Sequence, residues 1–164
     1  MSRPKSIILL IVWFLWAAGK DLDSLARFST TSDYYIYSSN SLAWLFFVLA
    51  GIVFLLNAAS VWYLFRPEPF GQKILLIALG TGIVYTLTTL GMAATDIDGA
   101  REAYAVGREV RGLPVREAAL DAIFTPRAMI IGGGLAVLVY LALGGLVLRN
   151  KLFFFGPGEH AAEV

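Results

Sequence analysis

The stretch LAWLFFVLAGIVFLLNAASVWYLF, residues 42–65, decides the fold of this chain. Apart from aromatic OH and NH groups, its only polar side chains are those of Asn57 and Ser60. A helix needs about 20 apolar residues to cross the hydrocarbon core of a bilayer. The stretch therefore predicts a membrane-spanning helix.

Two further stretches meet the same requirement. Residues 129–148 contain no ionisable group except the Tyr140 phenol, and the polar members of residues 74–94 all carry hydroxyls. Each stretch is long and apolar enough to span a bilayer. We expect three spans from these stretches alone.

The first segment is less apolar. Residues 7–19 are continuously apolar, but Lys20, Asp21 and Asp23 follow directly. The helical spacing of apolar residues continues beyond them, which predicts one helix over about 6–28 with Lys20 reaching outward. A cleavable signal peptide is the alternative, although the bulky Trp13 and Trp16 beside the small residues 17–19 disfavour it. We expect a fourth span here.

Basic residues near the span ends predict the orientation. Residues 1–5, 66–73 and 149–164 carry six basic and three acidic side chains, whereas residues 20–40 and 95–127 carry seven basic and nine acidic ones. The denser positive side is cytoplasmic. We therefore expect one membrane domain over 1–164 in a bacterial inner (plasma) membrane. Both termini, the turn 66–73 and the tail 149–164 are inside, with loops 29–41 and 95–127 outside.

The longer outer segment has its own helical pattern. Small and apolar residues recur at helical spacing over 100–107 and again over 115–123, with Gly112 and Pro114 between them. Asp96 or Asp98 is suited to cap the first of these helices. The predicted fold is an all-α integral membrane protein. It is a four-transmembrane-helix bundle with a short extracytoplasmic amphipathic helical hairpin between the third and fourth spans.

Composition excludes several classes of chemistry. The chain has no cysteine and a single histidine, His160, which removes disulfides, thiolate sites and haem held by two histidines. Residues 94–105 fail as a calcium loop because Ala105 occupies the position of the closing acid. A net charge of +1 gives no reason to expect a nucleic-acid partner. We expect no cofactor and no metal site.

Polar residues within the spans are candidates for lining a ligand site or lumen. Asn57 lies near the middle of its span, where an amide without a partner is costly. The third span carries a row of hydroxyls on one face. Interhelical hydrogen bonding is the structural alternative for all of them. The candidates are Asn57, Thr81, Tyr85, Thr88, Thr89 and Tyr140.

Two other groups complete the candidate residues. Gly133, Ala136 and Gly144 form a small-residue face on the last span, suited to helix packing or to docking a partner helix. The outer segments hold charged candidates for contacts with lipid or protein: Asp21, Asp23, Asp96, Asp98, Arg101, Arg108 and Arg111.

Three functions are compatible with these features. The first is a non-catalytic scaffold, accessory subunit or partner-binding bundle, acting in the lipid bilayer as a homo-oligomer or with other membrane subunits. The second is a small channel, or a carrier for a lipid or neutral solute, working as an oligomer. The third is an enzyme that acts on lipid headgroups through Asp21, Asp23, Asp96 or Asp98. The chain lacks a recognisable nucleophile–base pair, so we expect no enzymatic activity.

Overall fold

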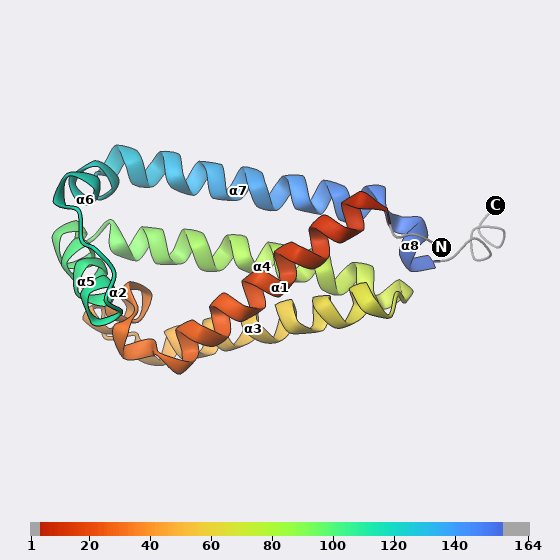
Figure 1. Cartoon of the computed structure of the whole chain (residues 1–164), viewed down its shortest axis with the longest axis horizontal. Helices are drawn as coiled ribbons and strands as arrows, with labels where there is room; N and C mark the ends of the chain where they lie inside the picture. The colour runs from red at the N-terminus through yellow and green to blue at the C-terminus, as the bar shows by residue number, and fades with distance from the viewer. Residues whose placement is uncertain (1–3, 156–164) are drawn as a thin grey trace.

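The computed structural model describes residues 4–155, and these residues form helices joined by short turns. The predicted tail from 156 onward, including His160, lies outside the described residues. Figure 1 labels most of the helices, which are α1 (Lys5–Ala26), η1 (Phe28–Thr30), α2 (Ser32–Ser39), α3 (Ala43–Phe65), α4 (Pro69–Ala93), α5 (Ile97–Val110), α6 (Glu117–Ile123), α7 (Pro126–Arg149) and α8 (Lys151–Phe155).

Three helices are long and apolar enough to cross a membrane, namely α3, α4 and α7. They correspond to three of the four predicted spans and indicate an integral membrane protein. Helix α1 has 22 residues, but Lys20, Asp21 and Asp23 lie in its last two turns. Its length therefore matches a span, while its composition does not reach that of the other three.

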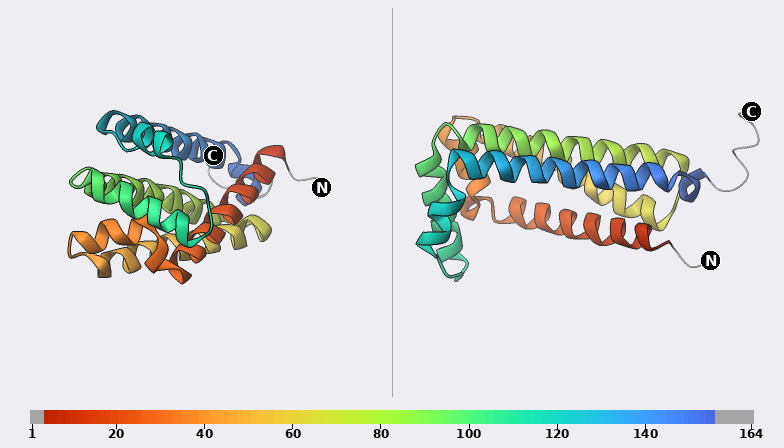
Figure 2. Two further views of the ribbon diagram at one scale, coloured as in Figure 1. Left: turned by 60° about the vertical axis from the view of Figure 1, so that its left-hand side comes forward. Right: turned by 90° about the horizontal axis from the view of Figure 1, so that it is seen from above.

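Helices α3, α4 and α7 run alongside one another, α1 crosses them obliquely, and the short helices lie at their ends (Figure 1). Helix α1 packs along α3, α3 packs against α4, and α4 packs against α7. Helices α2, α5 and α6 gather at one end, whereas α8 and the turn between α3 and α4 lie at the other (Figures 1 and 2). Helices α2, α5 and α6, which belong to segments predicted to share one side of the membrane, therefore lie at the same end of the long helices.

Several element boundaries differ from the predicted ones. The predicted loop 29–41 contains η1 and α2, and the hydroxyl of Thr31 caps α2 by accepting from the Tyr34 amide. Two prolines, Pro69 and Pro126, begin α4 and α7 where the sequence had suggested a turn and a loop. Proline at the first helical position costs no hydrogen bond, so these helices start earlier than hydropathy alone predicts.

A tightly packed cluster fills the end of the bundle near α8. Ser6 donates a hydrogen bond to Asn150 across 2.9 Å there, tying the start of α1 to the end of α7. Phe154 of α8 is only 3% exposed and completes the cluster. Its buried members are Ile7, Leu10, Ile11, Phe14, Leu64, Leu75, Ala78, Leu79, Leu143, Val147 and Phe154.

Helix α2 is fixed by the side chain of Tyr37 at the opposite end. Tyr37 is fully buried, its ring stacks on that of Tyr85, and its hydroxyl lies 3.1 Å from that of Thr89. Burial raises the pKa of the Tyr37 phenol, which keeps it neutral, so that its hydroxyl can form a hydrogen bond with the Thr89 hydroxyl. These contacts hold α2 against α3 and α4.

Helices α5 and α6 are separated at Gly112, the position that the sequence predicts. Gly112 has a φ of 68° and the Leu113 amide donates to the Arg108 carbonyl across 2.9 Å, which closes the end of α5. A left-handed glycine just past the last turn is a common helix stop. Helix α6 begins five residues later at Glu117.

Gly71 allows the start of α4 to approach α3 closely. A Cβ atom at this position would lie 2.7 Å from the Tyr63 Cβ atom, at the rigid base of that side chain. Contacts this short force the helices apart. The turn between α3 and α4 therefore requires glycine at position 71.

We expect Gly71→Ala to lower the free energy of unfolding by about 1–3 kcal/mol, because the added methyl group overpacks this contact. Thermal unfolding of the protein in mild detergent measures the loss. Gly80→Ala on the same helix is the matched control, since a Cβ there meets no atom within 4 Å. Equal stability of the two variants would contradict the proposed constraint.

Candidate functional site

A cavity of about 500 Å³ lies among the long helices. It lies between α2 and the apolar cluster near α8, which is called the main cluster below. Helices α1, α2, α3, α4 and α7 all contribute to its wall. Its size falls within the range of small-molecule sites. The lining residues are Trp13, Trp16, Ala17, Lys20, Asp21, Asp33, Val53, Asn57, Tyr85, Thr86, Thr89, Leu90, Gly132, Ala136, Val139 and Tyr140.

One polar pair joins α1 to α3 in this wall. The amide of Asn57, which is only 7% exposed, donates to Oδ2 of Asp21 across 2.7 Å. This bond supplies the partner that a mid-span amide needs. It brings together two residues that the sequence had assigned to separate candidate groups.

A second pair joins α4 to α2. The Tyr85 hydroxyl donates to Oδ2 of Asp33 across 3.0 Å. Asp33 is absent from the residues predicted from the sequence, because the sequence predicts a loop over residues 29–41. Thr31 as a helix cap, with Asp33 in the first turn and apolar Ile36 three residues later, is the signal that could have found it.

Aromatic contacts bound the cavity on the side of the main cluster. The rings of Trp13 on α1 and Tyr140 on α7 meet edge to face with centroids 5.9 Å apart. The Tyr140 ring also covers Gly82, where a Cβ would lie 2.7 Å from it. Beyond this contact α1 and α7 diverge toward the α2 end of the bundle (Figure 1). The cavity occupies the region where the two helices separate.

The remaining span candidates are divided among different environments. Thr81 donates to the Ile77 carbonyl of its own helix, and Thr88 does not line the cavity. Gly133 packs on Leu90 of α4, where a Cβ would lie 2.8 Å from a Leu90 methyl group. Ala136 lines the cavity, whereas Gly144 has open space around its Cα atom. Two residues of the small-residue face therefore have separate roles within the chain: Gly133 packs against α4, and Ala136 lines the cavity.

The outer aspartates do not converge on one site. Asp23 pairs with Arg27 at 3.1 Å on the exposed side of α1. Asp96 caps α5 by accepting from the Gly99 amide, a role predicted for it or for Asp98, which lies in the first turn. Of the four aspartates proposed as catalytic, only Asp21 lines the cavity.

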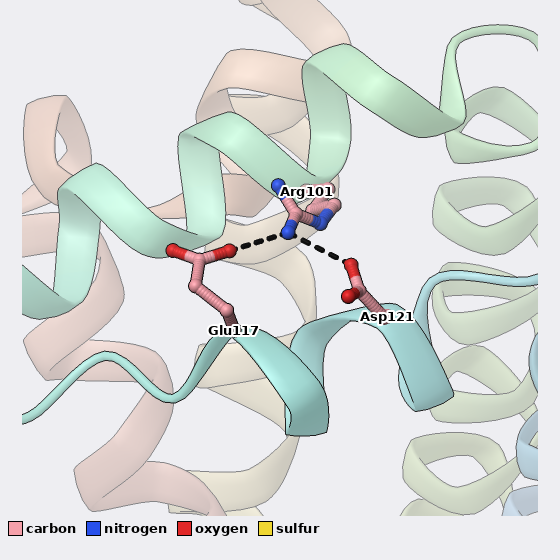
Figure 3. Close-up of polar contacts among 3 residues, drawn as sticks. All are labelled: Arg101, Glu117 and Asp121. Atoms are coloured by element: carbon pink, nitrogen blue, oxygen red, sulfur yellow. Dashed lines mark hydrogen bonds and ion pairs between the residues drawn. The ribbon is translucent and has the colours of Figure 1, made fainter.

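The outer arginines mainly hold α5 and α6 in place. Arg101 of α5 binds the carboxylates of Glu117 and Asp121 on α6, the latter at 2.8 Å (Figure 3). Arg108 donates to the Pro114 carbonyl across 2.9 Å. Arg111 donates to the Gly107 carbonyl and lines a smaller cavity of about 270 Å³ beside Lys20 and Asp33.

Within residues 4–155, no group of three or more histidine, cysteine, aspartate or glutamate side chains is arranged to hold a metal ion. The chain matches no protein-family model, and neither the curated proteins nor the solved structures compared with it give a match. The physical character of the cavity is therefore the basis for assigning a function.

We expect Asn57→Ala and Asp21→Ala to be non-additive by about 1 kcal/mol in the free energy of unfolding, because each removes the same hydrogen bond. A double-mutant cycle in mild detergent measures this coupling. Asp23→Ala combined with Asn57→Ala is the control and should be additive, since Asp23 pairs with Arg27 instead. Additivity of both cycles would count against the bond between Asn57 and Asp21.

Proposed function

We propose that this chain is a non-catalytic integral membrane protein that binds a small amphiphile, as in the binding step of a carrier for a lipid or a lipid-like solute. The observation that carries this proposal is the two-part wall of the 500 Å³ cavity. Apolar side chains from α1, α3, α4 and α7 line one part, and hydrogen-bonded polar side chains from α1, α2, α3 and α4 line the other.

The apolar part suits a hydrocarbon body. Ala17, Val53, Gly132, Ala136 and Val139 leave a smooth wall without donors or acceptors on their side chains. Small residues dominate this wall, so the space between α1 and α7 stays unfilled. An apolar ligand body gains affinity here through the surface that it removes from water.

The polar part suits a head group. Asp21 and Asp33 are each held by one neutral donor, from Asn57 and Tyr85. A carboxylate has about four lone-pair sites, so both retain capacity for a ligand. A few fixed polar groups at one end of an apolar cavity are typical of sites that orient their ligand.

This proposal takes the place of the scaffold interpretation as our leading one. The scaffold interpretation was based on the missing catalytic residues, on the amphipathic hairpin and on a free face made by Gly133, Ala136 and Gly144, and it stays open as the alternative. Gly133 is packed against α4 and Ala136 lines the cavity, so only Gly144 is left for a partner helix.

We further propose that α1 is a fourth span and that α2, α5 and α6 lie on the outer side as a cap with an amphipathic hairpin. Residues of α1 that face away from the bundle are apolar, including Ile8, Val12 and Leu15, each at least half exposed. Such a face suits lipid. Asp21 faces Asn57 instead, which lowers the cost of placing its carboxylate at membrane depth.

Filling the cavity with a larger side chain is expected to weaken the binding of the amphiphile. We expect Ala136→Phe to weaken amphiphile affinity about tenfold or more, because the ring occupies space that the ligand body needs. Decyl amphiphiles are titrated into nanodiscs while the fluorescence of Trp13 and Trp16 is followed. Trp44→Phe and Trp62→Phe remove the signal of two tryptophans that do not line the cavity.

Leu135→Phe is the matched control, because Leu135 neighbours Ala136 on α7 but is 59% exposed. It should keep the affinity of the parent protein. Ala17→Leu fills the opposite wall and serves if Ala136→Phe does not fold. The absence of saturable binding in the parent, or unchanged affinity in both filling variants, would overturn the proposed function.

The topology predicts which single cysteines are labelled from outside the cell. Because the chain has no native cysteine, Glu109→Cys, Glu68→Cys and Lys5→Cys can each be tested without background. We expect an impermeant maleimide to label only position 109 in intact cells and all three after permeabilisation. Labelling of position 5 together with 109 in intact cells would exclude a spanning α1.

A further inference from the structure

The polar part of the cavity carries an excess of negative charge. Asp21, Asp33 and Lys20 line it, and Asp21 is influenced electrostatically by the ammonium of Lys20 and by the carboxylate of Asp33. Within residues 4–155, neither Asp21 nor Asp33 forms a salt bridge with a basic side chain. Both carboxylates are thus positioned by neutral donors, and Lys20 acts on Asp21 through space without forming an ion pair with it.

The basic side chains near the cavity are less well placed than the two carboxylates to determine the sign of the ligand's charge. Lys20 is exposed and its flexible stem is not fixed by a hydrogen bond to another described residue. Arg111 of α5 lines the adjoining smaller cavity and uses its Nε atom on the Gly107 carbonyl. An anionic head in the main cavity would meet two carboxylates held by hydrogen bonds and one exposed ammonium, which is unfavourable.

Aromatic rings add a second preference for positive charge. Trp13, Trp16, Tyr85 and Tyr140 all line the cavity, and the Trp13 ring lies between those of Trp16 and Tyr140 at 5.6 and 5.9 Å. The face of an aromatic ring attracts a cation, most strongly where water is excluded. Rings and carboxylates around one cavity are the combination that recognises alkylammonium groups.

We propose that the ligand of this cavity is a cationic amphiphile, an alkylammonium whose head lies between Asp21 and Asp33 and whose body follows Ala136 and Val139. This inference rests on the proposed function and specifies its ligand. It requires only non-covalent binding. The two carboxylates supply the charge selectivity, and the apolar wall supplies the affinity for the chain.

Matched head groups test the charge preference. Decyltrimethylammonium, decyl glucoside and decyl sulfate are titrated separately into protein in nanodiscs of an uncharged galactolipid, with Trp13 and Trp16 fluorescence as the signal. We expect the cation to bind about tenfold more tightly than the glucoside, and the sulfate to bind most weakly. Binding of all three with equal affinity would overturn the cation preference while leaving the proposed function intact.

Charge variants test the residues. Asp33→Asn and Asp21→Asn should each weaken the binding of decyltrimethylammonium about tenfold. They should weaken the binding of decyl glucoside by less than about threefold, because the asparagine side-chain oxygen still accepts a hydrogen bond from a sugar hydroxyl. Asp23→Asn, also on α1 but outside the cavity, is the matched control and should change neither. Lys20→Gln removes a positive charge that repels the cationic ligand. This variant should bind decyltrimethylammonium about threefold more tightly.

The outcomes separate the two proposals. If none of the three amphiphiles binds saturably, the proposed function fails. If they bind saturably but the aspartate variants and Lys20→Gln leave the cation affinity unchanged, the charge assignment fails. If the aspartate variants do not fold, the Lys20→Gln variant alone tests the charge assignment. An unchanged or weakened affinity of that variant for decyltrimethylammonium would contradict the inference.

Discussion

The hydrogen bond between Asn57 and Asp21 constrains much of the rest of the structure. A polar group between apolar helices must find a partner within the protein, because the surrounding lipid offers none. Asn57 finds it on α1, the helix whose last turns are the least apolar among the long helices. The bond therefore fixes the register of α1 against α3 and directs a carboxylate into the bundle.

The two other buried polar links follow the same rule and bring α2 into the bundle. Tyr85 reaches Asp33, and the Tyr37 hydroxyl reaches Thr89, so α2 and α4 are joined by two hydrogen bonds. These links connect residues 52 positions apart in the chain. Together with the bond from Asn57, they concentrate polar groups at one end of the bundle. The end near α8 is held by packing among large apolar side chains and by the hydrogen bond from Ser6 to Asn150.

The sequence reveals the parts of this structure that depend on local composition. Hydropathy alone locates α3, α4 and α7, and the stop at Gly112 follows from its place before Pro114. The cost of an amide within a span correctly singles out Asn57 as needing a partner. Which partner it finds depends on how α1 lies against α3, which no local pattern specifies. The same limit applies to α2, since its polar segment is held in place by the burial of Tyr37 among distant residues.

The cavity itself arises from a contrast in residue size along α7. Gly132 and Ala136 face α1 with almost no side chain, whereas Tyr140, Leu143 and Val147 fill the following turns. Small residues normally let helices approach. Here Tyr140 meets Trp13 and covers Gly82, so α7 is held at the distance that a ring requires. The small residues beyond it then leave open space beside the carboxylates. The glycine and alanine residues of α7 could have packed closely against a neighbouring helix. They line a cavity instead, because Tyr140 in the next turn contacts Trp13 and keeps α7 away from α1.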